Sequence, residues 1–257
     1  HSDHRRQRQM CIRDRMYIIG VDEAGRGPAI GPLVVCALGV PEEDIEVLSD
    51  IGAKDSKSMS KKKRMELASE IYSEAEKRRW KIGLISCSAS RIDQERIRTN
   101  LNKLEVELFK EAILATDIKK NLGEILLDAC DIDEQRFGNN VHKNLGKKWE
   151  KWTVKSKHKM DSDNIIVGAA SILAKVQRDS EISQIGKSLN LEIGSGYPSD
   201  PKTIIAIKEL VSGEYPNRYL RWSWKTVERI WFEVNNRPMP NRDESNGNSK
   251  QSSLNDW

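Results

Sequence analysis

The sequence lacks long hydrophobic runs, cysteine pairs and internal repeats. Its apolar runs fall far short of the roughly 20 residues that a membrane-spanning helix needs, and the N-terminal stretch has no apolar core of a secretory signal. Only four cysteines occur, and none of them is spaced C-x-x-C, so no disulfide framework is indicated. These absences predict a cytoplasmic protein with free thiols.

Excess charge of one sign is also nearly absent. The 257 residues include 43 basic and 39 acidic side chains, which leaves a net charge of +4. The distribution is more informative, because basic residues gather over residues 54–64 and again over residues 143–159. Such runs are usually solvated faces, but two of them in one small domain are compatible with a track along a phosphate backbone.

The two ends of the chain differ in composition from the rest. The string Met10-Cys-Ile-Arg-Asp-Arg15 resembles translated sequencing-adaptor sequence, so we expect residues 1–15 to be an extraneous leader and Met16 the true start; a basic nucleic-acid arm is the alternative. Beyond Asn235 the chain is rich in Pro, Asn, Asp, Ser and Gly and has almost nothing to bury. This composition predicts a disordered tail over residues 236–257 and leaves residues 16–235 as one folded domain.

Between these ends, apolar periodicity alternates between strands and helices. Continuous apolar runs predict buried strands at 16–21, 32–40, 80–86 and 124–128, and weaker alternation predicts an exposed strand within 148–157. Helical spacing predicts helices at 101–112, 134–145, 164–189, 202–211 and 226–234. A further helix follows Ser58 or Ser60 as its cap, with the apolar positions Met65, Ala68, Ile71, Tyr72 and Ala75. The order indicates an α/β domain with a mixed sheet flanked by helices and a C-terminal helical extension.

The segment Asp22-Glu-Ala-Gly-Arg-Gly27 follows an apolar strand directly. Carboxylates at a strand end suit a hard divalent cation. Gly25 and Gly27 let the backbone approach a ligand closely, and Arg26 offers a fork of donors for phosphate. Acids for a metal beside an arginine for phosphate suggest metal-assisted phosphodiester chemistry. Since neighbouring side chains on a strand point to opposite faces, Asp22 and Glu23 serve one site only if the strand ends or kinks at Glu23.

Two further acids stand at the ends of predicted elements. Asp128 ends the strand 124–128, and Asp161 stands just before the helix 164–189, whose dipole stabilises an ionised acid. Catalytic residues on open α/β sheets gather at strand ends. Two divalent cations about 4 Å apart also need several carboxylates to share them. A helix N-terminal charge without a metal remains the alternative for Asp161.

The motifs occur in the order found in ribonuclease HII, and residues 16–234 resemble the archaeal form of that family. The resemblance rests on Asp22–Gly27, Asp55-Ser-Lys57, Leu127-Asp-Ala129, Lys157-His-Lys-Met-Asp161, Ala169–Lys175 with Arg178-Asp179, and Gly194-Ser-Gly-Tyr-Pro-Ser-Asp-Pro201. It implies an RNase H-like fold and dependence on Mg²⁺ or Mn²⁺. It also implies two-metal-ion hydrolysis of RNA in RNA/DNA hybrids, with nicking on the 5′ side of ribonucleotides embedded in duplex DNA.

Residue by residue, the resemblance makes Asp22, Glu23, Asp128 and Asp161 the metal-binding catalytic acids. It implies that Gly25, Arg26 and Gly27 read the ribose 2′-hydroxyl and the adjacent phosphate, and that Tyr197 stacks at the RNA–DNA junction. A tyrosine in a Gly-Tyr-Pro turn is otherwise typically a packing residue. The candidates for phosphate contacts are Lys54, Lys57, Lys175 and Arg178.

Three positions depart from the family pattern. Ser58 stands where Lys is usual, Met160 where Ala is usual and Gly168 where Ser is usual. The first change removes one expected phosphate contact, the second lies beside an expected metal ligand, and the third is expected to affect packing alone.

The C-terminal segment Gln251-Ser-Ser-Leu-Asn-Asp-Trp257 places Gln251, Leu254 and Trp257 three residues apart. In a 3₁₀ turn this spacing brings the three side chains to one side. The pattern resembles the sliding-clamp-binding box at the C-terminus of archaeal ribonuclease HII, although the second aromatic common in that box is missing. A chance match of a short motif is the alternative.

Other functions stay open on the sequence alone. Another RNase H-like nuclease, such as ribonuclease HIII or a Holliday-junction resolvase, is one alternative; the intact Gly25–Gly27 and the turn 194–201 favour ribonuclease HII. A catalytically inactive nucleic-acid-binding scaffold is another, and the presence of all four acids argues against it. We expect a monomer that acts on nucleic acid and not at a membrane.

Overall fold

The structure is a computed structural model that describes residues 16–53 and 59–242. These residues form two compact units, each assembled from segments that are far apart in the sequence. The first unit comprises 16–24, 35–53, 59–85 and 105–176, and the second comprises 25–34, 86–104 and 177–242. The predicted domain 16–235 therefore spans two units. Within the described ranges, no helix combines the length and apolarity that a membrane span requires.

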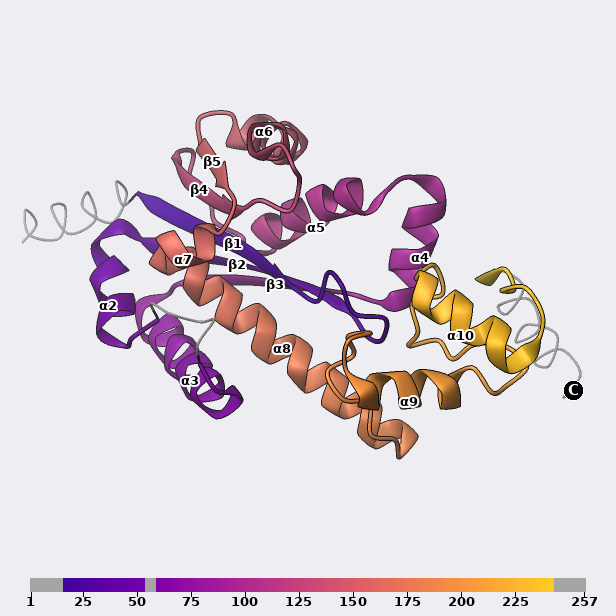
Figure 1. Ribbon diagram of the computed structural model, residues 1–257. Helices are drawn as coiled ribbons and strands as arrows, with labels where there is room; N and C mark the ends of the chain where they lie inside the picture. The colour runs from indigo at the N-terminus through magenta and orange to yellow at the C-terminus, as the bar shows by residue number, and fades with distance from the viewer. Residues whose placement is uncertain (1–15, 54–58, 243–257) are drawn as a thin grey trace, which may run out of the picture. The chain divides into compact units, whose positions relative to one another are not determined.

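A five-stranded mixed sheet organises the first unit (Figure 1). Its strands are β1 (Tyr17–Ala24), β2 (Leu33–Pro41), β3 (Lys81–Cys87), β4 (Gly123–Asp128) and β5 (Thr153–Lys157), in the order β3-β2-β1-β4-β5. β1 pairs with β4, and β4 with β5, in parallel. β2 is buried along its whole length, as its continuous apolar run predicts. The predicted α/β fold with a mixed sheet is confirmed.

Among the described residues, six helices lie wholly or partly in the first unit. They are α2 (Ile45–Asp50), α3 (Lys61–Arg78), α5 (Leu101–Ala115), α6 (Glu134–Leu145), α7 (Met160–Asp163) and α8 (Ile165–Leu189), with short 3₁₀ turns η1 (Glu42–Asp44) and η2 (Lys147–Trp149). Glycines allow the closest approaches. A Cβ on Gly20 of β1 would lie 2.6 Å from the backbone at Ile166 and Val167 of α8, and one on Gly83 of β3 would overlap α5. α6 covers β5 (Figure 1).

The helix after the first hairpin begins as predicted, but it presents a different face to the core. Ser60 caps α3 by accepting a hydrogen bond from the Lys63 amide, whereas the alternative cap Ser58 lies outside the described residues. The buried positions are Leu67, Ala68, Ile71 and Ala75. Met65 and Tyr72 follow the same apolar spacing, but they are 54% and 44% exposed.

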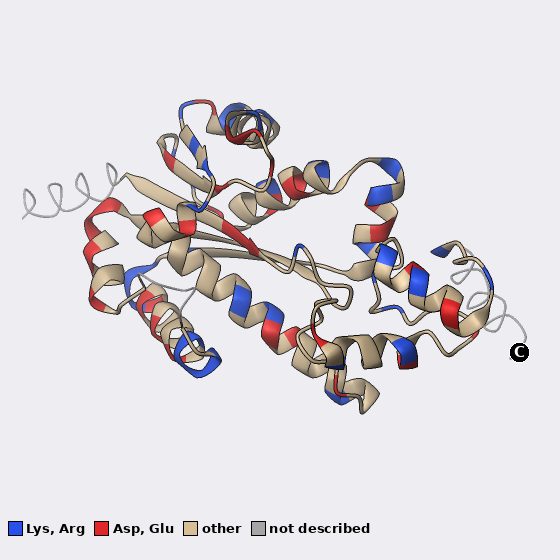
Figure 2. Cartoon of the chain, viewed as in Figure 1, with Lys and Arg blue, Asp and Glu red and all other residues tan. Residues whose placement is uncertain are grey.

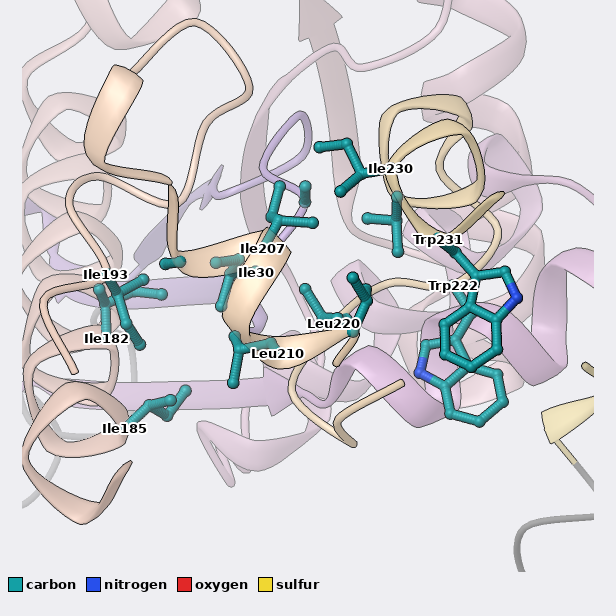
Figure 3. Packing of buried hydrophobic residues seen from close by; sticks show 14 residues of the cluster. Ile30, Ile182, Ile185, Ile193, Ile207, Leu210, Leu220, Trp222, Ile230 and Trp231 are labelled. Atoms are coloured by element: carbon teal, nitrogen blue, oxygen red, sulfur yellow. The ribbon is translucent and has the colours of Figure 1, made fainter. Parts of the chain in front are cut away.

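Helices α4 (Ala89–Arg98), α9 (Pro201–Leu210) and α10 (Lys225–Asn235) build the second unit. Its core joins Ile182 and Ile185 at the end of α8 to apolar residues of α9 and α10 (Figure 3). Ile30, Leu220 and Trp222 come from loops and complete the same cluster. Since Ile30 follows closely on Gly25–Gly27, this core fixes one end of that segment.

The expectation of disorder beyond Asn235 was wrong for residues 236–242. The Trp231 indole N–H donates to the Pro238 carbonyl at 3.0 Å, and Arg242 is buried beside Asp93 at 3.0 Å. Arg237 also donates to the Glu214 carbonyl, and Met239 packs against the core of the second unit. Most of these contacts are polar, so the composition of the segment gave little apolar signal. Residues 1–15, 54–58 and 243–257 lie outside the described residues, and with them Lys54, Lys57 and the tail motif Gln251, Leu254 and Trp257.

Candidate active site

Three carboxylates from three elements meet in the first unit. Asp22, Asp128 and Asp161 each offer one oxygen atom, and these atoms lie within 4.8 Å of one another. Asp22 and Asp161 are buried, while Asp128 is half-buried. Figure 2 shows acidic residues in red on β1 and on α7. Such a group of carboxylate oxygens has the chemistry that a hard divalent cation prefers.

The strand register explains why Asp22 and Asp128 meet. β1 and β4 run in parallel with Val21 opposite Leu127, so the next residue on each strand reaches the same level of the sheet. Both acids therefore stand at the carboxyl ends of adjacent parallel strands, which is where α/β sheets gather functional groups.

Asp161 arrives by a turn that follows β5. Lys159 adopts a left-handed conformation, and the Met160 amide donates to Asp128 Oδ1 at 3.1 Å, which ties α7 to the second acid. The contact uses the Met160 backbone, so the change from the usual Ala leaves it in place. Gly168 of α8 packs behind, where a Cβ would lie 2.9 Å from the Asp161 carbonyl. The unusual glycine thus brings α8 close to the acid.

Glu23 lies beside this group, although the strand does not end at it. β1 ends at Ala24, one residue after Glu23. Ser171 of α8 hydrogen-bonds Asp22, and Glu23 lies near the charges of Glu105 of α5 and of Asp128. The carboxyl groups of Asp22 and Glu23 also hydrogen-bond each other at the strand end.

The site concentrates negative charge away from water. Burial raises the pKa of Asp22 well above its ordinary value, and the adjacent Glu23 charge raises it further. Burial also raises the pKa of Glu23, and the charges of Glu105 and Asp128 add to the shift. Like charges in a buried site disfavour ionisation, and a bound cation would relieve that repulsion.

Glu105 and Ser171 belong to the surroundings of these acids, and sequence reasoning missed both. Glu105 is fully buried in α5 next to Leu104, and the usable signal was an acid on the apolar face of an amphipathic helix. Ser171 is fully buried in α8, and the Lys175 ammonium donates to its hydroxyl at 2.7 Å. The Ser171 hydroxyl therefore connects Lys175 to Asp22 through two hydrogen bonds.

The segment Gly25–Gly27 lies in the second unit. Gly25 has φ +93°, and a Cβ there would lie 2.7 Å from the Arg178 side chain and from the Pro32 carbonyl. The Arg26 guanidinium donates to Asn102 Oδ1 at 2.9 Å. Gly27 faces Tyr197, whose ring would lie 3.4 Å from an added Cβ. The path of this loop therefore depends on the missing side chain at Gly25, whereas Gly27 leaves space beside the Tyr197 ring.

Tyr197 projects from a rigid turn. Tyr197 is 38% exposed, and the Arg178 guanidinium lies 5.1 Å from the centroid of its ring. Arg178 is buried, and it donates to the Ser195 carbonyl at 2.6 Å. Its guanidinium thus holds the turn and one face of the tyrosine ring in place.

Comparison with known proteins agrees with this fold. The family described as Ribonuclease HII matches residues 19–227. The ribonuclease HII of Methanocella arvoryzae is 43% identical over 215 residues, which cover 83% of this chain and 91% of that protein. The crystal structure of ribonuclease H2 from Pyrococcus horikoshii OT3 is similar with a TM-score of 0.76 at 36% identity, over 86% of this chain and 100% of that one.

A second solved structure is the PCNA:RNase HII complex from Archaeoglobus fulgidus. It is similar with a TM-score of 0.70 and 31% identity, over 88% of this chain and 99% of that chain. The fold is therefore RNase H-like, the class that the sheet and its acids define. The chain belongs to the ribonuclease HII family, so it is a hydrolase of the ribonuclease H type, and the resemblance seen in the sequence is confirmed.

Proposed function

We propose that the protein is an endoribonuclease that hydrolyses RNA in RNA/DNA hybrids and nicks duplex DNA on the 5′ side of an embedded ribonucleotide. The products carry a 3′-hydroxyl and a 5′-phosphate. The meeting of Asp22, Asp128 and Asp161 within 4.8 Å carries the proposal, together with membership of the family.

The acids hold divalent metal ions, either Mg²⁺ or Mn²⁺. All the donors are carboxylate oxygens, which suit these ions, and the raised pKa values of Asp22 and Glu23 mark a site that gains from added positive charge. Once bound, a pair of such ions supplies an activated water and stabilises the leaving oxygen. Asp22, Asp128 and Asp161 are the main metal ligands, and Glu23 is an additional ligand. The Ser171 hydroxyl orients Asp22 through its hydrogen bond.

RNA is distinguished from DNA by the loop Gly25–Gly27, which follows Glu23 along the chain after one residue. The ribose 2′-hydroxyl is both a donor and an acceptor, so closely placed backbone groups can recognise it. Tyr197 offers an exposed ring for stacking at the RNA–DNA junction, and Arg178 supports that ring. Lys57 and Lys175 are the phosphate contacts.

The decisive experiment uses a DNA duplex with one ribonucleotide, an all-DNA duplex and a four-way DNA junction, each with Mg²⁺, with Mn²⁺ or with EDTA. We expect one metal-dependent nick 5′ of the ribonucleotide and an intact all-DNA duplex. Cleavage of the junction would indicate a resolvase, and binding without cleavage would indicate a scaffold.

Tyr197→Ala is expected to lower kcat/KM on the single-ribonucleotide duplex by roughly 5- to 100-fold, the range of one lost aromatic stacking contact. The melting temperature should change little, because the ring is 38% exposed. Steady-state cleavage and thermal unfolding measure the two effects.

Tyr219→Ala is the matched control for this variant. Tyr219 also lies under an arginine, with the Arg218 guanidinium 5.0 Å from its ring centroid, but it is not part of the proposed substrate contacts. Its loss should leave kcat/KM unchanged. If Tyr197→Ala unfolds the protein, Tyr197 is a packing residue.

The C-terminal segment tethers the enzyme to a sliding clamp. The spacing of Gln251, Leu254 and Trp257 supports this, as does the similarity to the Archaeoglobus fulgidus protein that was solved with PCNA. Tethering raises the effective concentration of the nuclease on clamp-loaded DNA without a new contact at the active site.

Leu254→Ala with Trp257→Ala is expected to weaken clamp binding at least about tenfold, because apolar anchors carry most of such an interface. Calorimetry with the sliding clamp from the same source measures the effect. Ser252→Ala with Ser253→Ala is the control, since neither serine lies on the three-residue face. Equal affinities for all three proteins would show that the segment has no part in clamp binding.

A further inference from the structure

Two side chains hold the loop Gly25–Gly27 through its carbonyl groups. Arg221 is fully buried, and its guanidinium donates to the carbonyls of Gly25 at 2.6 Å and Arg26 at 2.9 Å. The Trp224 indole N–H donates to the Gly27 carbonyl at 3.1 Å. Three consecutive carbonyls therefore accept hydrogen bonds from one short segment near the C-terminal end of the second unit.

These bonds determine where the loop's N–H groups point. A planar trans peptide places its carbonyl and its N–H on opposite sides, and all described peptide bonds are trans. With the Gly25 and Arg26 carbonyls turned to Arg221, the N–H groups of Arg26 and Gly27 point away from it. Successive N–H groups on one side form a cradle for an electronegative atom.

The holding segment is itself braced. The Arg221 amide donates to the Ala29 carbonyl at 2.9 Å, next to the antiparallel bridge between Ile30 and Leu220. Ile30 and Leu220 lie together in the core of the second unit (Figure 3). The loop and the segment that holds it are therefore joined at one end by backbone pairing and packing.

A buried carboxylate fixes the other side of the segment. Asp93 of α4 accepts from the Trp222 amide at 2.8 Å and from the Ser223 hydroxyl at 2.6 Å. Two guanidinium groups lie against the Trp224 ring, with Arg96 at 4.7 Å and Arg221 at 4.9 Å from its centroid. Neither Arg221 nor Trp224 can shift without disturbing several of these contacts.

The chemistry of Arg221 points to positioning. Burial and, to a smaller extent, the nearby Arg178 charge together lower the pKa of Arg221 to about 9, so the side chain is still charged at neutral pH. Burying a charge is costly unless hydrogen bonds compensate for it. The Arg221 guanidinium donates its hydrogen bonds to backbone carbonyls of a glycine-rich loop. Without these bonds, the conformational freedom of glycine would leave the orientation of the peptide planes in the loop unfixed.

We infer that Arg221 and Trp224 are positioning residues for ribose recognition, which orient the peptide planes of Gly25–Gly27 so that their N–H groups meet the substrate. The inference rests on the proposed function of that loop. Its readout is the ratio between the Kd for an all-DNA duplex and the Kd for the same duplex with one ribonucleotide. Both are measured with Ca²⁺ in place of the catalytic ion.

Trp224→Phe removes one donor and keeps an aromatic ring. It is expected to lower this ratio about fivefold, the effect of one net hydrogen bond. Trp231→Phe is the control, because its indole also donates to a carbonyl, that of Pro238, and lies in α10, the helix that begins directly after Trp224. The control is expected to lower the melting temperature and to leave the ratio unchanged.

Arg221→Lys keeps the charge but loses the planar fork, so it is expected to lower the ratio at least about tenfold. If Trp224→Phe and Arg221→Lys lower the melting temperature and keep the wild-type ratio, their role is structural and the inference is overturned. A wild-type protein that binds both duplexes equally would instead overturn the proposed function of the loop.

Discussion

Asp22→Asn is expected to reduce cleavage by roughly a thousandfold or more, the usual scale for loss of an essential catalytic group. The change removes a charged ligand from the group of Asp22, Asp128 and Asp161, while it touches no proposed phosphate contact. Duplex binding should therefore persist. Asp128→Asn is expected to behave in the same way, and retained activity in either variant would contradict the role of that acid.

The same substitution is expected to stabilise the metal-free protein at neutral pH. The pKa of Asp22 in the folded state is raised above its ordinary value of 3.8, mainly by burial. A raised pKa means that stability is complete below the unfolded value and is lost as pH rises through the folded value. Asparagine carries no charge, so the variant avoids this loss.

Thermal unfolding in EDTA and in Mn²⁺ checks this effect. In EDTA at pH 7 the melting temperature of Asp22→Asn should exceed that of the wild type, and the difference should vanish below about pH 4. Added Mn²⁺ should stabilise the wild type more, since a ligand that binds only the folded state raises its stability. Equal melting temperatures in EDTA at pH 7 would contradict the charge repulsion.

Asp131→Asn is the matched control for the sign of this effect. Asp131 lies three residues after Asp128, and hydrogen bonds from Arg136 lower its pKa. A lowered pKa contributes stability above the unfolded value, so Asp131→Asn should lower the melting temperature at pH 7. Cleavage should remain, because Asp131 is not among the three acids that meet.

The positions of Asp22 and Asp128 at strand ends could be predicted from the sequence. Asp22 and Asp128 follow apolar strands, and parallel pairing is enough to bring such ends together. Glu105 stands on the apolar face of its helix, which is a signal of burial but does not predict a place beside Glu23. Its burial depends on α5 packing near Glu23, a contact between segments that the periodicity of neither one records.

The second unit was harder to predict for the same reason. α4 went unnoticed because its buried face offers only Ala89, Ile92 and the acid Asp93. Arg221 contacts the Gly25 carbonyl from 196 positions away, and nothing in the local pattern around Arg221 predicts a buried charge. Residues of this kind can be identified only from the three-dimensional structure, because the backbone that they contact is distant in the sequence.

Gly25→Ala is expected to cost both stability and activity. The φ of +93° is strained for any side chain, at about 1–3 kcal/mol. Its Cβ would also lie 2.7 Å from the Pro32 carbonyl, and overpacking of this kind costs about 1–3 kcal/mol more. A backbone oxygen cannot swing aside as a flexible side chain can. Thermal unfolding should show a large fall in melting temperature, and an unchanged value would contradict the strained conformation.

Gly27→Ala separates the fold from recognition in the same loop. The nearest atom to its Cβ is Tyr197 Cε1 at 3.4 Å, an ordinary contact, so the variant should fold with the wild-type melting temperature. The methyl group nevertheless fills space between the loop and Tyr197, where we propose that the ribose binds. Cleavage at a single ribonucleotide should fall at least about tenfold, since sub-ångström misplacement at a reacting group is costly. Full activity in Gly27→Ala would place the ribose elsewhere, whereas loss of activity without loss of stability would show that the glycine serves the substrate and not the fold.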